Sequence, residues 1–211
     1  MTIAEPFSAQ QLVLEDVDWA LYESLLKQVG DQHIFITYDQ GRLELMSPSW
    51  EHDKRGRRIG LLINVLAEEV RIPIEGGGTT TFRRTDLRKG LEPDQCFYVE
   101  HVESVRGKKR IDLSVDPPPD LAIEVEVSRR VLPRIPVYES LGVPELWRDD
   151  GRHVRILHLG ANGSYRPAKR SRSFPMLHVD HIERLLAKSE VMDEMNWMRS
   201  TREWIRSNLV K

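Results

Sequence analysis

The chain has 211 residues, of which 40% are hydrophobic and 30% charged, and this balance is typical of a globular protein with one sizeable core. A formal net charge of −2 argues against a globally basic nucleic-acid-binding protein. No run approaches the roughly 18 consecutive apolar residues of a membrane span. The first residues lack the basic and apolar regions of a signal peptide, so we expect a cytoplasmic protein.

The first part of the chain predicts a helix, a hairpin and a second, longer helix. Leucines at helical spacing predict a helix over residues 16–29. Residues 33–38 and 42–46 read as two strands joined by a turn. Ser47, Pro48 and Ser49 form a good helix start, and the apolar spacing that follows predicts a helix to about residue 71.

The middle of the chain predicts short strands and exposed connections. Residues 72–75 and 79–82 look like strands around a triglycine turn, which lacks the pattern of a phosphate-binding loop. Apolar runs at 96–99 and 121–127 predict two further strands. The polar segment 103–115 between them, followed by three prolines, predicts an exposed loop or flap.

The last third predicts a short helix, two hairpins and two terminal helices. Residues 134–141 form the short helix, which Gly142 ends. Strands at 144–147 and 153–158 pair as a hairpin, and the turn at 161–163 starts another. Helices are expected over 179–188 and 191–209.

These elements predict a single mixed α/β domain over residues 1–211. It would contain an N-terminal helix and hairpin to about residue 48, a core over about 49–160 and a helical tail over about 176–211. An apolar stripe on the last helix, with two tryptophans beside it, would pack on the domain or form an interface; its members are Val191, Met195, Trp197, Met198, Trp204, Ile205 and Leu209. We expect this stripe to support a homodimer.

Acidic residues interrupt two strands that should otherwise be buried. Asp94 comes directly before one apolar strand, and Glu124 lies inside the next. Carboxylates are rarely buried unless they are paired or bound to metal. Two of them on neighbouring strands can meet at one hard cation, and Mg²⁺ commonly takes one or two carboxylates together with substrate phosphates. The single cysteine, Cys96, excludes a multi-cysteine zinc site and reads as a small buried residue.

Basic residues are clustered along the chain despite the negative net charge. The clusters lie at residues 54–58, 83–89, 106–110, 129–130 and 169–172. Each alone is most often solvated surface, but collected on one face they could hold a phosphate backbone.

Four segments together resemble the Uma-two family. They are residues 43–52 (LELMSPSWEH), 90–98 (GLEPDQCFY), 118–125 (PPDLAIEV) and 134–147 (RIPVYESLGVPELW). This is a bacterial group of endonucleases with the restriction-endonuclease-like PD-(D/E)xK fold, in which a central mixed sheet is flanked by helices. The resemblance covers roughly residues 42–157.

The resemblance implies a metal-dependent endonuclease that hydrolyses DNA. Asp94 and Glu124 would be the carboxylate ligands of Mg²⁺ or Mn²⁺, and the Val125 carbonyl would supply a further oxygen. Glu51, on the first helix of the family pattern, would act through water or at a second cation, although it could equally favour a helix N-terminus.

Two positions depart from the family pattern. Glu126 stands where the motif has lysine, and it could add a ligand or form a salt bridge. Arg134 stands four residues before Tyr138, where the lysine of this family is often found instead. Arginine can bind a phosphate but is a poor general base.

Several alternatives stay open at this point. His52 reads more readily as a surface or capping residue than as a ligand, and Tyr138 as packing. For the whole protein, the alternatives to an endonuclease are a catalytically inactive nucleic-acid-binding or regulatory protein on the same fold, and a protein-interaction module.

Overall fold

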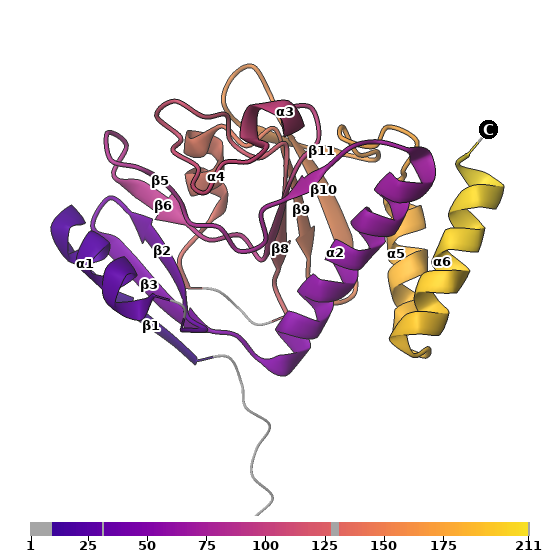
Figure 1. Cartoon of the computed structure of the whole chain (residues 1–211). Coiled ribbons are helices and arrows are strands. Elements are labelled where there is room, and N and C mark those ends of the chain that lie inside the picture. The colour runs from indigo at the N-terminus through magenta and orange to yellow at the C-terminus, as the bar shows by residue number, and fades with distance from the viewer. Residues whose placement is uncertain (1–9, 31, 128–130, 211) are drawn as a thin grey trace, which may run out of the picture.

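The computed structural model describes residues 10–30, 32–127 and 131–210, in which two β-sheets are flanked by helices (Figure 1). The first sheet is antiparallel, with strand order β1-β3-β2-β6-β5. The second sheet has the order β11-β10-β9-β8-β7-β4 and is mixed, because β8 and β9 run parallel. The expected mixed α/β architecture is therefore present, although the strands divide between two sheets.

Most of the strands lie on the predicted runs, but residues 10–14 and 89–91 form strands that were not predicted. The first sheet contains β1 (Gln10–Leu14), β2 (Phe35–Asp39), β3 (Arg42–Ser47), β5 (Phe82–Arg84) and β6 (Lys89–Leu91). The second contains β4 (Glu75–Gly76), β7 (Gln95–Tyr98), β8 (Leu121–Val125), β9 (Glu145–Asp149), β10 (Val154–Leu159) and β11 (Tyr165–Ala168). The predicted strands around the triglycine thus belong to different sheets.

The helices are α1 (Trp19–Val29), α2 (Trp50–Val70), α3 (Val102–Val105), α4 (Ile135–Leu141), α5 (Val179–Ser189) and α6 (Glu194–Asn208). All but the short α3, which lies in the expected loop, were predicted. The Ser49 side chain caps α2 by accepting the backbone N–H of His52 at 3.3 Å. Gly142 ends α4 with a φ of 76°, a conformation that glycine adopts without a Cβ clash.

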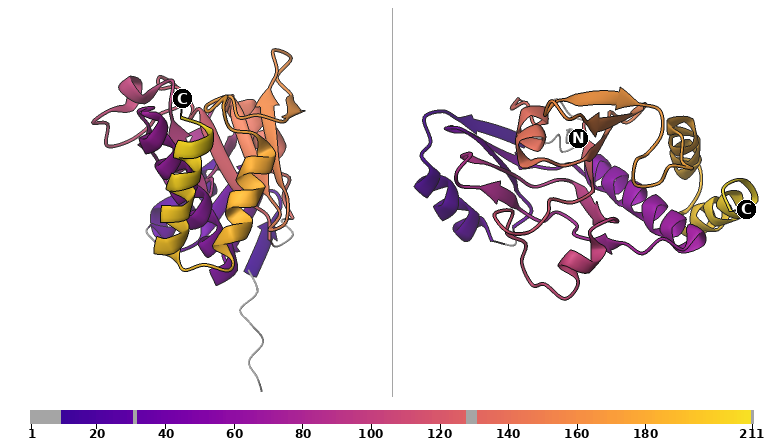
Figure 2. Two further views of the ribbon diagram at one scale, coloured as in Figure 1. Left: turned by 90° about the vertical axis from the view of Figure 1, so that its right-hand side faces the viewer. Right: turned by 90° about the horizontal axis from the view of Figure 1, so that it is seen from above.

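Helix α2 joins the second sheet to the C-terminal helices. One of its faces packs on β7 and β8, and another packs on α5 and α6, which lie side by side at one end of the molecule (Figures 1 and 2). Ile59, Leu62, Ile63 and Leu66 are at most 1% exposed in this core. Burial of these side chains stabilises the packing by roughly 1.5–3 kcal/mol each.

The buried face of helix α6 differs from the predicted apolar stripe. Trp197 and Ile205 are fully buried, and the Trp197 indole N–H donates to the carbonyl of Leu185 at 2.8 Å. Val191 and Met195 are instead 85% and 52% exposed. The prediction of this stripe is therefore wrong for Val191 and Met195, because α6 begins only at Glu194 and docks through Trp197.

The chain crosses from the first sheet to the second through Glu92, Pro93 and Asp94, which connect β6 to β7. Helix α4 lies beside this crossing, because it contacts β5 and β6 of the first sheet while Tyr138 and Leu141 pack in a cluster with Ala122 of β8. Residues from both sheets, α2 and α4 therefore meet around Asp94.

Candidate functional site

Asp94 is fixed at the end of β8 by backbone hydrogen bonds. Its own N–H donates to the Ile123 carbonyl at 3.1 Å, and its Oδ2 accepts the N–H of Val125 at 2.6 Å. The residue is 4% exposed. The carboxylate predicted to be buried is thus buried, and β8 positions it.

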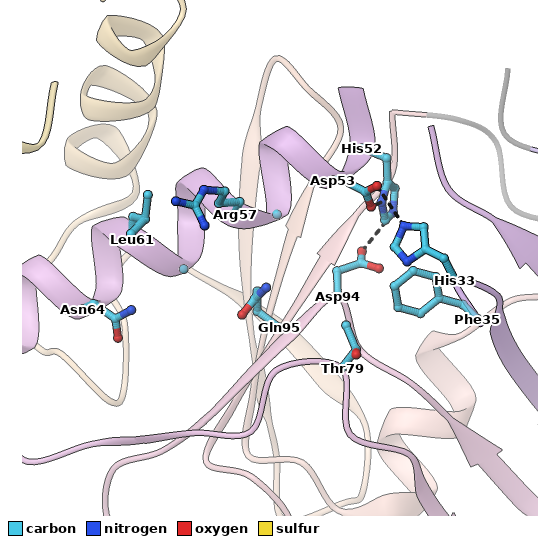
Figure 3. A pocket seen from close by; sticks show the side chains of 12 residues that line it. His33, Phe35, His52, Asp53, Arg57, Leu61, Asn64, Thr79, Asp94 and Gln95 are labelled. Atoms are coloured by element: carbon cyan, nitrogen blue, oxygen red, sulfur yellow. Dashed lines mark hydrogen bonds and ion pairs between the residues drawn. The ribbon is translucent and has the colours of Figure 1, made fainter. Parts of the chain in front are cut away.

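His52 brings helix α2 to this carboxylate. Its Nε2 lies 3.2 Å from Asp94 Oδ2, and the side chain is 2% exposed (Figure 3). On its other side, Nδ1 lies 3.6 Å from Asp53 Oδ1, and the other oxygen of Asp53 lies 2.9 Å from His33 Nε2. The expectation of a surface or capping histidine is therefore wrong. His52 precedes Ile59 by two helical turns, so both residues lie on the buried face of α2. This helical spacing could have predicted the burial of His52 from the sequence.

Glu124 faces helix α4. Its Oε1 accepts a hydrogen bond from the Tyr138 hydroxyl and lies 3.1 Å from Nη2 of Arg134. Burial, followed by the charge of Glu124, raises the pKa of Tyr138 well above its ordinary value. Tyr138 therefore remains a neutral donor, and it contacts a predicted site residue as well as packing in the core.

Arg134 is a buried cation beside Glu124. It is 5% exposed, and its Nη2 also donates to the carbonyl of Glu92. Burial alone would lower the pKa of Arg134, but the negative charges of Glu124, Asp94 and Glu44 raise it above its ordinary value. Among the residues that the structure describes, Arg134 Nε and Nη1 have no hydrogen-bond partner. Such buried, unbonded N–H groups can receive the oxygens of an anion.

Asp94 and Glu124 point toward different helices. A Cβ placed on Gly56 of α2 would lie 3.8 Å from both Asp94 Cβ and Val125 Cγ2, so these side chains face α2. Glu124, next to Val125 on the strand, faces α4 instead, as the alternation of side chains along a strand requires. Arg134 pairs with Glu124 at 3.1 Å, and the charge of Asp94 also raises the pKa of Arg134.

The other predicted site residues lie at the edge of this group. Glu126 makes a two-point ion pair with Arg148, with N–O distances of 2.9 and 2.7 Å, so the salt bridge is the alternative that the structure contains. Glu51 is exposed on the first turn of α2, while its neighbour His52 turns inward. Val125 lies between Glu124 and Glu126 in the sequence and is 1% exposed.

The basic cluster at residues 54–58 does not form an open phosphate-binding face. Lys54 pairs with Glu190 at 3.3 Å, and Arg55 pairs with Asp149 at 2.5 Å. Arg57 pairs with Glu194 at 2.8 Å. These cations hold α2 to the C-terminal helices and to β9. The expected cluster at residues 129–130 lies outside the described residues.

A family model described as "Putative restriction endonuclease", Uma2, matches residues 19–186. The chain belongs to the Uma2 family. The match extends beyond the segments that carried the resemblance, from the start of α1 into α5. No curated protein matches the chain.

A solved structure shares the fold of this Uma2 protein. It is the crystal structure of a "putative nuclease belonging to DUF820" from Anabaena variabilis ATCC 29413, with a TM-score of 0.50 and 13% sequence identity. The similarity covers 77% of this chain and 90% of that one. At this identity the likeness establishes a shared fold alone, and the mixed α/β architecture is consistent with a restriction-endonuclease-like core. None of the helices formed by the described residues has the length and apolar character needed to cross a bilayer.

Proposed function

We propose that the protein is a Mg²⁺- or Mn²⁺-dependent endonuclease that hydrolyses DNA phosphodiester bonds. The observation that supports this most is the group formed by Asp94, Glu124 and Arg134. Two buried carboxylates from neighbouring strand ends accompany a buried guanidinium with unbonded N–H groups. Membership in a family described as restriction endonucleases makes a nucleic-acid phosphodiester the natural substrate.

The possible donor atoms at this position are oxygens, the type of ligand that a hard divalent cation prefers. Mg²⁺ prefers oxygen ligands, and Asp94, Glu124 and the Val125 carbonyl are the proposed donors. Because Asp94 faces α2 and Glu124 faces α4, a shared cation requires at least one of these two side chains to turn. Among the described residues, no group of three or more His, Cys, Asp or Glu side chains is arranged to hold a metal ion. Arg134 also lies 3.1 Å from Glu124, so a cation would share this carboxylate with the guanidinium.

Some residues of the chain would orient the reacting groups, and others would supply charge. When bound, the cation would supply charge neutralisation at the phosphate and a lower pKa for the attacking water. Arg134 would hold the scissile phosphate through its Nε and Nη1 groups, which have no partner among the described residues. It would not accept a proton, because a guanidinium stays protonated. Tyr138 would orient Glu124 by donating its hydroxyl hydrogen.

The test is cleavage of supercoiled plasmid with Mg²⁺ or Mn²⁺. We expect Asp94→Asn and Glu124→Gln each to slow cleavage at least about a hundredfold, because each removes a charge next to the reacting phosphate. Glu145→Gln is the matched control. Glu145 is also fully buried, but it lies at the other end of the sheet and accepts hydrogen bonds from Trp147 and Ser173.

Circular dichroism of all variants would show that the fold is kept. Cleavage by Asp94→Asn and Glu124→Gln at the parent rate would reject the proposal. Loss of cleavage in Glu145→Gln as well would show that any buried carboxylate matters, and the assignment to Asp94 and Glu124 would then lose its support.

An inactive nucleic-acid-binding protein is the second candidate, and the Glu126–Arg148 ion pair favours it. The motif position that carries lysine is here Glu126, directly after β8, and it is paired with Arg148, so no lysine ammonium stands at that position. Tight DNA binding by a parent protein that never cuts, with either metal, would favour this candidate over the nuclease.

A further inference from the structure

A cavity of about 430 Å³ opens between helix α2 and the ends of β2 and β7, and Asp94 lines it (Figure 3). Cavities from about 300 Å³ upward hold small organic ligands. The floor is open because Gly56 and Gly60, one helical turn apart, face it from α2. A Cβ on Gly60 would lie 3.3 Å from Gln95 Oε1, so any side chain there would crowd the cavity.

The walls of the cavity combine an apolar ring with two amides. Phe35 stands between the rings of His33 and His52, at 6.0 Å from each. Asn64, one turn beyond Gly60, and Gln95, next to Asp94, also line the cavity. Neither side-chain amide is hydrogen-bonded to another of the described residues. Each therefore offers a donor and an acceptor to a ligand.

The charge of the cavity decides which part of a nucleic acid it can hold. Asp53 and Asp94 both line it, and Arg57, which also lines it, is paired with Glu194 at 2.8 Å. Without a cation at Asp94, a phosphate group would meet the two carboxylates and be repelled. A neutral heterocycle with hydrogen-bonding edges suits the apolar ring and the free amides.

A second cavity, of about 420 Å³, shares His33, Phe35 and Thr79 with the first. Thr80 and Thr81 contribute further hydroxyl groups to its lining. Two cavities that share a wall are better suited to two consecutive nucleotides of a strand than to one small molecule.

We propose that the cavity beside Asp94 binds an unpaired base of the nucleic-acid strand, read by Gln95 and Asn64. This inference rests on the proposed function and narrows the substrate class to single-stranded or locally opened DNA. A base stacked inside a duplex cannot enter a cavity of this kind unless it is turned out of the helix.

The experiment distinguishes binding through the bases from binding through the phosphates. Fluorescence anisotropy is measured without divalent metal on a mixed-sequence single strand about eight nucleotides long, and on a strand of equal length whose sugars lack bases. Both strands carry the same phosphates. We expect the parent to bind the complete strand roughly five- to a hundredfold more tightly, since each held base contributes about 1–3 kcal/mol.

Gln95→Leu and Asn64→Leu should bring this affinity ratio close to one. Gln28→Leu is the matched control, because Gln28 is an exposed helical amide on α1, outside both cavities, and it should keep the parent ratio. Equal binding of both strands by the parent would overturn the proposal. So would an unchanged ratio in the Gln95 and Asn64 variants.

Cleavage assays on the same proteins distinguish failure here from failure of the nuclease proposal. Metal-dependent cleavage that needs Asp94, together with a ratio of one in the parent, would leave the nuclease standing and reject the base site. A high ratio that depends on Gln95, in a protein that never cuts, would keep the base site and reject the nuclease.

Discussion

Arg134 is the residue on which the chemistry of this site depends most. It is buried, paired with Glu124 and hydrogen-bonded to the Glu92 carbonyl, which joins α4 to the crossing between the sheets. Taking a partner away from a buried ion pair leaves an uncompensated charge and costs about 3–5 kcal/mol. Substitutions of Arg134 therefore affect stability and cleavage together, and both must be measured.

We expect Arg134→Lys to retain or raise DNA cleavage, because a positive charge remains beside the carboxylates and an amine can also accept a proton. Arg134→Ala should lower cleavage and reduce the free energy of unfolding by about 3–5 kcal/mol. Plasmid cleavage and urea denaturation measure the two effects. Arg148→Ala is the control, because its partner Glu126 is 28% exposed in a more open ion pair.

Two results would contradict this role for Arg134. One is an Arg134→Ala variant that remains folded and cuts as fast as the parent. The other is an Arg148→Ala variant that loses cleavage as completely as Arg134→Ala, because the effect would then follow from any broken ion pair on the sheet.

The sequence predicts some residues of the site and misses others for a physical reason. Asp94 and Glu124 stand out because each is an acid beside or within an apolar strand, so local pattern predicts their burial. His52 and Tyr138 lie on helices, where an inward-facing polar side chain looks like core or cap. Their partners, Asp94 and Glu124, lie 42 and 14 residues away in the sequence, and a local pattern does not contain such a pairing.

At the scale of elements, the predictions hold where a pattern is long enough to be periodic. Helices α1 and α2 and the hairpin of β2 and β3 begin and end close to their predicted residues. Strand β6 was missed because three residues around a glycine carry no alternation. Strand β1, an edge strand that pairs with β3, was also missed. Helix α3 was missed because four residues carry no helical stripe.

Helix α6 is held by one large side chain, and this gives a direct stability prediction. Trp197→Ala should lower the free energy of unfolding by about 3–5 kcal/mol, because Trp197 is fully buried and stacks under the Arg58 guanidinium at 5.1 Å. Trp50→Ala is the control and should change it by less than about 0.5 kcal/mol, since Trp50 is 81% exposed. Urea denaturation that gives equal losses for both variants would show that α6 does not dock in this way.

At the scale of the whole molecule, the division into two sheets could not be predicted from local pattern. Strands β4 and β5 are close in sequence yet belong to different sheets, and β2 pairs with β6 about fifty residues later, since Tyr38 faces Gly90. Such pairings depend on long-range burial of both sheets. They place the crossing at Glu92–Asp94 between α2 and α4, which is how distant segments form one site.

Association of two copies stays a prediction. The inward turn of Trp197 and Ile205 removes part of the surface first expected to support it, while Val191 and Met195 remain exposed. The account of the site does not depend on a second copy, because α2, α4, β7 and β8 of one chain bring its residues together.

The central claim is that Asp94 and Glu124 bind one divalent cation for DNA hydrolysis, and crystals soaked in Mn²⁺ test it most directly. Anomalous scattering locates manganese independently of the protein atoms. We predict one peak about 2.0–2.6 Å from an oxygen of each carboxylate. No peak at saturating Mn²⁺, or a peak that contacts neither carboxylate, would contradict the account.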